Sequence, residues 1–107
     1  MILLEQNSQE YNNDLRAMIM AFFPGVKIVE KLEGEDMPKF IFVARYDEAE
    51  TSLAILDDYS DMETIEGSYL DKADFRNKLK LASYHLLSRY ADRTLPWGDL
   101  TGVRPTK

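Results

Sequence analysis

Apolar residues recur at helical spacing in two segments of the chain. The first segment predicts a helix that begins after Asn7 or Ser8 and ends before Pro24. Asn7 or Ser8 is suited to cap its start, with Glu10 three residues after Asn7 completing a capping box. The apolar stripe of this helix consists of Tyr11, Leu15, Met18, Ile19 and Phe22. One face of the helix is therefore expected to be buried.

The second helical segment spans residues 71–90. Asp71 and Asp74 lie in its first turns, where the helix dipole favours negative charge. Its core stripe consists of Phe75, Leu79, Ala82, Leu86 and Tyr90, flanked by Leu81 and Leu87. This helix too is expected to bury one face.

Between the helices, apolar and polar residues alternate as in strands. The clearest strand is 39–46, whose inner face would hold Phe40, Phe42, Ala44 and Tyr46. Residues 26–32 and 51–56 are expected as its neighbours, because short connections favour antiparallel pairing. Residues 62–65 are a candidate for a fourth strand or an edge, and Ile2-Leu3-Leu4 for a first strand.

Each helix and the sheet have one apolar face, and packing the helices against the sheet in two layers buries these faces best. The expected fold class is α+β. It would be a two-layer sandwich in which an antiparallel meander sheet of three to four strands packs both helices on one face. A chain of 107 residues has room for one such domain, and 45% hydrophobic with 30% charged residues is ordinary for a soluble globular chain.

The composition excludes several classes of function. The chain has no cysteine, which rules out a disulfide, thiolate-bound zinc, an iron–sulfur cluster or a cysteine nucleophile on these residues. The longest apolar run, 17–23, is far short of the roughly 20 residues that span a bilayer. The N-terminus lacks the basic region and cleavage site of a signal peptide, so we expect a cytoplasmic protein without membrane attachment.

Negative charge is concentrated in the body of the chain. Residues 1–92 carry 10 basic and 18 acidic side chains, a net −8, whereas residues 93–107 are net +2 from three bases and one acid. No base lies between Arg45 and Lys72. Such a surface repels a phosphate backbone, so nucleic-acid binding is not expected.

Several residues that could bind a metal or a ligand are better explained by their place in the structure. Asp57, Asp58, Asp61 and Glu63 lack the spacing of a calcium loop and are better explained as a solvated acidic loop. His85 is the only histidine and is expected at the surface or a boundary. Core packing is expected of Met18, Met20 and Met62, and of Phe40, Phe42, Tyr46 and Phe75.

The last residues, 96–107, form the most distinctive motif. Two glycines free the backbone for positive φ, Pro96 and Pro105 hold their neighbours extended, and Trp97 carries a large ring that needs a surface to pack on. No residue after Lys107 supplies that surface. We therefore expect the chain to be an N-terminal piece of a longer protein.

The run Leu95-Pro-Trp-Gly-Asp-Leu-Thr-Gly-Val-Arg-Pro-Thr-Lys107 resembles the junction of the HemZ-type oxygen-independent coproporphyrinogen III oxidases, which are radical SAM enzymes. In that family an L-T-G-[VI]-R-P-x-K run separates a small N-terminal domain from the catalytic barrel. The preceding helix, Phe75 to Tyr90, is also similar in pattern and position. The resemblance implies a small accessory domain at 1–92, and at 93–107 a linker to the barrel.

The resemblance also implies the chemistry of the whole protein. Its barrel would hold a [4Fe–4S] cluster and S-adenosylmethionine, and would oxidatively decarboxylate coproporphyrinogen III to protoporphyrinogen IX in heme biosynthesis. The family's C-x-x-x-C-x-x-C motif is absent here, so we expect no catalysis and no cofactor on this chain. The implied partners are the barrel itself and, for the whole protein, the tetrapyrrole substrate.

Two roles stay open for the terminal run: an interdomain connector, or direct contact with an anion such as a substrate propionate. The residues concerned are Trp97, Thr101, Gly102, Arg104, Pro105 and Lys107. A different class of function is a stand-alone acidic protein-interaction module that holds a basic partner. An autonomous enzyme is the least favoured, because no nucleophile–base or metal constellation is visible.

Overall fold

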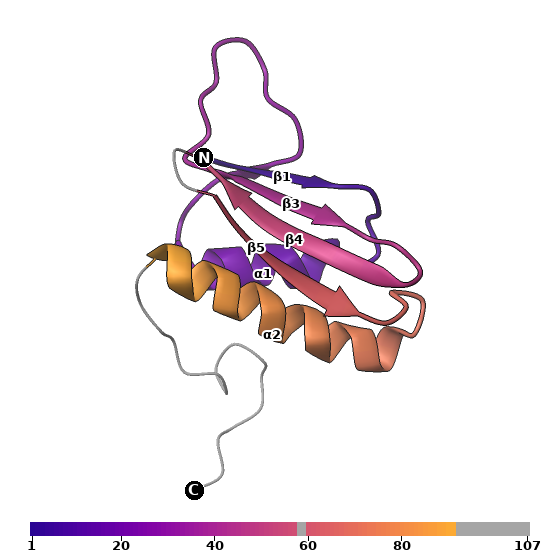
Figure 1. Cartoon of the computed structure of the whole chain (residues 1–107). Coiled ribbons are helices and arrows are strands. Elements are labelled where there is room, and N and C mark those ends of the chain that lie inside the picture. The colour runs from indigo at the N-terminus through magenta and orange to yellow at the C-terminus, as the bar shows by residue number, and fades with distance from the viewer. Residues whose placement is uncertain (58–59, 92–107) are drawn as a thin grey trace, which may run out of the picture.

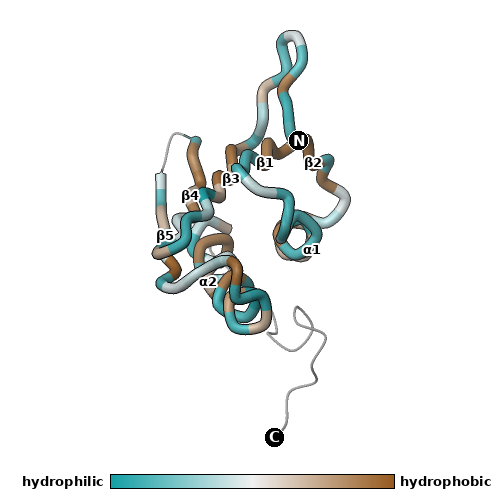
Figure 2. The backbone as a smooth tube through the Cα atoms, turned by 90° about the vertical axis from the view of Figure 1, so that its right-hand side faces the viewer, coloured by the Kyte–Doolittle hydropathy of each residue, from teal (hydrophilic) through white to brown (hydrophobic). Residues whose placement is uncertain are grey.

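The computed structural model describes residues 1–57 and 60–91, and within them two helices and five strands (Figure 1). The elements in chain order are β1 (Ile2–Gln6), α1 (Asn12–Phe22), β2 (Ile28–Val29), β3 (Ile41–Arg45), β4 (Glu50–Leu56), β5 (Ser60–Glu66) and α2 (Lys72–Ala91). The sheet forms one layer, and both helices lie on the same side of it (Figure 2). The α+β class and both helices are confirmed.

The sheet is mixed and five-stranded, in the order β2-β1-β3-β4-β5. The expected antiparallel meander of three to four strands is therefore wrong in detail: only β3, β4 and β5 pair in that way. β1 is inserted between β2 and β3 and runs parallel to both. α1 accounts for the pairing with β2, since a helical crossover returns the chain in the same direction, and the connection 30–40 returns it once more before β3. Residues 26–32 were expected as a longer strand, but only Ile28 and Val29 pair with β1.

The core lies between the sheet and the helices. The α1 stripe is confirmed, because all five of its residues are buried. The inward face of β3 and its flanks is confirmed as well, since Phe40, Phe42, Ala44 and Tyr46 are buried. On α2, Phe75, Leu79 and Leu86 are buried and Ala82 and Tyr90 are partly buried. Leu87 is buried, but Leu81 is 47% exposed and lies outside the core.

Asn7 does not cap α1, contrary to expectation, and instead extends the pairing of β1 with β3. Its side-chain Nδ2 donates to the carbonyl of Tyr46 at 2.9 Å, and its Oδ1 accepts from the Tyr46 N–H at 2.7 Å. α1 begins five residues later, at Asn12, without a side-chain cap. At its far end Gly25 turns the chain with a φ of +78°, a conformation that glycine adopts readily.

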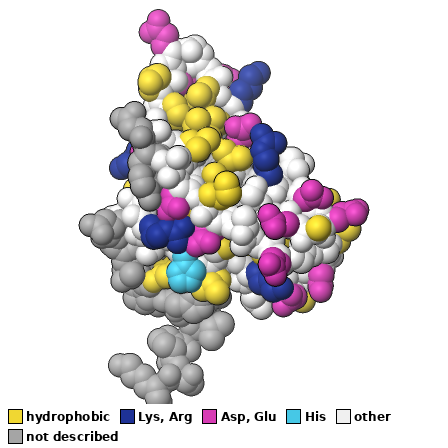
Figure 3. Space-filling model, viewed as in Figure 1, with side chains coloured by type: hydrophobic (Ala, Val, Ile, Leu, Met, Phe, Trp, Pro, Cys, Tyr) yellow, Lys and Arg dark blue, Asp and Glu magenta, His cyan; other side chains and the backbone are white. Residues whose placement is uncertain are grey.

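The face of the sheet opposite the helices is apolar at one end and charged at the other. Among the described residues no helix covers it, and Figure 3 shows hydrophobic side chains gathered on this side of the molecule. The register places Leu3, Ile41, Leu56 and Met62 at the apolar end. Met62 is 59% exposed and Met20 on α1 is 48% exposed, so the expectation that both fill the core is wrong, whereas Met18 is buried as expected.

Candidate functional site

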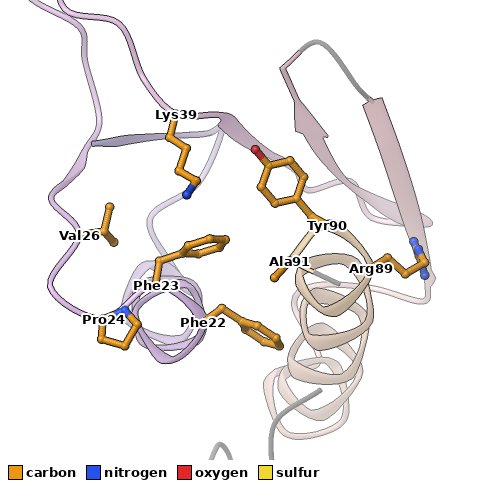
Figure 4. A pocket seen from close by; sticks show the side chains of 8 residues that line it. All are labelled: Phe22, Phe23, Pro24, Val26, Lys39, Arg89, Tyr90 and Ala91. Carbon is orange, nitrogen blue, oxygen red and sulfur yellow. The ribbon is translucent and has the colours of Figure 1, made fainter. Parts of the chain in front are cut away.

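An open pocket lies where α1 and α2 end beside the start of β3 (Figure 4). Its volume is about 1030 Å³, enough for several side chains of a partner. The lining residues are Phe22, Phe23, Pro24, Val26, Lys39, Arg89, Tyr90 and Ala91. Most of this lining is apolar, and it includes Ala91, the last residue of α2.

Three aromatic rings contact one another at this pocket. The ring centroids of Phe40 and Tyr90 are 4.7 Å apart, those of Phe23 and Phe40 5.4 Å, and those of Phe23 and Tyr90 6.2 Å. Phe40 is buried, whereas Phe23 and Tyr90 are only partly buried and present ring surface to the pocket. Tilted and edge-on ring pairs at these distances are favourable, so the aromatic wall is a stable, preformed surface.

Lys39 brings a positive charge to the aromatic wall. Its Nζ lies 4.9 Å from the centroid of the Phe23 ring, within the range of a cation–π interaction. Its backbone N–H donates to the Met1 carbonyl at 2.7 Å, which fixes the residue beside β1. At Lys39 the pocket therefore combines apolar surface with a positive charge, a pairing suited to an apolar partner that carries a carboxylate.

Tyr90 is held in place by Asp57, whose carboxylate accepts the tyrosine hydroxyl hydrogen bond. Burial, together with this hydrogen bond and the charge of Asp57, raises the pKa of Tyr90 to about 12. The phenol therefore stays protonated at neutral pH and is a poor general base. The described lining of this pocket is suited to binding rather than to proton transfer.

Arg89 turns away from the aromatic wall and binds the acidic residues of β5. Its Nε donates to Asp61 and its Nη1 to Glu63, both at 2.7 Å. The hydrogen bond that Arg89 donates to Asp61, and then the one it donates to Glu63, raise the pKa of Arg89. Asp61 and Glu63, expected in a solvated loop, thus form an ion-pair cluster with α2. Among residues 1–57 and 60–91, no group of three or more His, Cys, Asp or Glu could hold a metal ion.

The residues singled out at the end of the sequence lie outside the described residues. This holds for Trp97, Thr101, Gly102, Arg104, Pro105 and Lys107, and also for Asp58 of the acidic group. Their roles as interdomain or anion contacts stay predictions. His85 is exposed on α2, at the surface as expected.

The pocket residues were not identified from the sequence. Tyr90 was assigned to the core stripe of the second helix, and Phe23 and Lys39 were assigned no role. One indication was present in the sequence: Phe23 follows Phe22, the last residue of the apolar stripe, and is an aromatic residue outside that stripe. The pocket itself joins three segments distant in sequence, which no local pattern reveals.

Comparison of the chain with protein-family models, with curated proteins and with solved structures finds no match. Within the part of the chain that the structure describes, neither helix is long and apolar enough to cross a membrane.

Proposed function

We propose that residues 1–92 are the N-terminal accessory domain of a radical SAM protein similar to oxygen-independent coproporphyrinogen III oxidase. Residues 93–107 would link this domain to the barrel, and the whole protein would oxidatively decarboxylate coproporphyrinogen III in heme biosynthesis. Support comes from the terminal run 95–107, which resembles the domain junction of that family.

The aromatic pocket is the observation that best supports this role. It lies at Ala91, immediately before the proposed linker, and it presents Phe23 and Tyr90 to the outside. A preformed apolar surface next to a domain junction is where we expect a following domain to pack. Lys39 would meet an acidic group at the rim of that interface.

The chemistry of the whole protein would belong to the barrel. This chain has no cysteine, so its residues do not fit a [4Fe–4S] cluster, and the cluster and S-adenosylmethionine would be held elsewhere. The domain would contribute packing and shielding to the barrel, with no catalytic step of its own.

Phe23→Asp in the whole protein tests the pocket as the packing surface. We expect turnover of coproporphyrinogen III to fall at least about tenfold, because a carboxylate would be placed in an apolar interface. Met37→Asp is the control, since Met37 is 84% exposed and does not line the pocket, and the turnover of this variant should match the parent. Equal turnover of both variants, with the Phe23→Asp domain folded by circular dichroism, would exclude the pocket as the interface.

A stand-alone acidic interaction module is the second candidate function, favoured by the absence of any base from residue 46 to residue 71. The parent reading frame separates the two proposals. A C-x-x-x-C-x-x-C barrel after Lys107 supports the accessory domain, and a stop codon there supports the module.

A further inference from the structure

β5 is an edge strand whose outer side is open. It ends the strand order, so no described strand pairs with that side. The Gly67 N–H donates to the Ala49 carbonyl at 3.0 Å, so the backbone groups of Gly67 point toward the β4 side. In an antiparallel ladder only every second residue directs its N–H and C=O toward the partner strand, and the residues between them direct theirs away. Met62, Thr64 and Glu66 therefore direct their backbone groups toward the open edge.

The two ends of this edge are occupied by side chains of the chain itself. Asp61 Oδ1 accepts from the Met62 N–H at 2.8 Å, and Lys78 Nζ donates to the Glu66 carbonyl at 3.4 Å. Between them, and within the described part of the chain, Thr64 keeps its N–H and carbonyl open on this side. The middle of β5 is thus able to pair with another strand.

A groove of about 390 Å³ runs between this edge and α2. Thr64 and Ile65 line it from β5, and Leu81, Ala82 and His85 line it from α2. In Figure 3 the histidine lies on this face among acidic, basic and hydrophobic side chains. The exposed position of Leu81, which the core does not explain, is explained by such a groove.

We propose that β5 and α2 form a docking groove for an extended segment of a basic partner protein, which adds to β5 as a further strand. Pairing with the Thr64 backbone would supply main-chain hydrogen bonds, and every second partner side chain would enter the groove beside Leu81. This site goes beyond the proposed accessory role and does not depend on it.

The charges around the groove favour a basic partner. Glu66 lines it, as does Glu63, which is ion-paired with Arg89, and nine acidic residues with no base lie between Arg45 and Lys72 in the sequence. The two bases of α2 nearest the groove are already paired, Lys78 with Asp74 at 3.0 Å and Arg89 with the acidic residues of β5.

A second copy of this chain is a poor occupant of the same edge. Antiparallel pairing of two β5 strands would place acids of both copies on each face of the new ladder, Asp61 and Glu63 on the inward face and Glu66 on the outward face, and like charges on facing strands are destabilising. The inward-facing acids therefore act against self-association while leaving the edge open to a strand of opposite charge.

The probe is a random dodecapeptide library displayed on phage and selected on the 1–107 chain. We expect selected peptides to alternate apolar and basic residues, and their affinity, measured by fluorescence anisotropy, to weaken as salt is raised. Thr64→Pro removes the open N–H without touching the β4 pairing and should weaken binding at least about tenfold. Thr64→Ala keeps the N–H and loses only the side chain, so its affinity loss should be much smaller than that of Thr64→Pro.

A second pair of variants tests the groove wall without altering the strand. Leu81→Asp should weaken the same peptides at least about tenfold, whereas Leu70→Asp should not, because Leu70 is 61% exposed and outside the groove. The proposal would be overturned if the selection yielded no binder, or if the peptides bound Thr64→Pro and Leu81→Asp as tightly as the parent. Dimerisation through β5 without peptide binding would overturn it too.

Discussion

Phe42→Ala is expected to lower the free energy of unfolding of this domain by about 3–5 kcal/mol. Phe42 is fully buried on β3, the middle strand of the sheet, and its register neighbours Leu4 and Ile55 are buried too. Removing the ring leaves a cavity that the surrounding sheet cannot close. Because domains of this size are stable by only about 5–15 kcal/mol, this loss would remove a large share of the free energy of unfolding.

Urea denaturation followed by circular dichroism measures this effect. Met37→Ala is the control, since an 84% exposed side chain should contribute less than about 0.5 kcal/mol. A loss of less than about 1 kcal/mol for Phe42→Ala would show that β3 is not at the centre of the core.

Asn7→Ala is expected to cost about 1–3 kcal/mol. The Asn7 amide donates to and accepts from the Tyr46 backbone, so its removal leaves both the N–H and the C=O of Tyr46, directly after β3, without this partner. Tyr46 is buried, and water would replace these hydrogen bonds poorly.

The same urea titration tests this prediction, with Asn77→Ala as the matched control. Asn77 is exposed on α2, and alanine is a good helix former, so its replacement should not destabilise the domain. Equal stability of the two variants would mean that the Asn7 side chain does not hold the ends of β1 and β3 together.

The helices and the central strand could be predicted because each is specified by a local pattern. Four of the five predicted stripe residues lie in α1, the fifth, Tyr11, directly precedes it, and all five are buried. The alternation from Phe40 to Tyr46 likewise gave the correct inner face of β3. In both cases the spacing of side chains within one element decides which face is buried.

Strand order could not be predicted, because it depends on pairing between distant segments. Ile2-Leu3-Leu4 indicates a strand but not its neighbours, and β1 proves to be an inner strand with parallel partners on both sides. The length of β5 was underestimated for a similar reason. Asp61 and Glu63 look like loop residues until Arg89, 28 and 26 residues further along the chain, pairs with both.

The binding surfaces were the least predictable part. The aromatic pocket joins Phe23, Lys39 and Tyr90 from three separate segments, and the β5 groove depends on a helix lying beside a strand edge. Leu81 shows the difficulty clearly, since a leucine beside a core stripe is ordinarily buried and here remains 47% exposed.

Turnover of coproporphyrinogen III by the whole protein, with and without residues 1–92, tests the proposed role of this domain most directly. We expect the barrel alone to retain its cluster and its cleavage of S-adenosylmethionine but to lose most of the decarboxylation, because the docked accessory domain would be missing. Undiminished decarboxylation by the barrel alone would contradict the account.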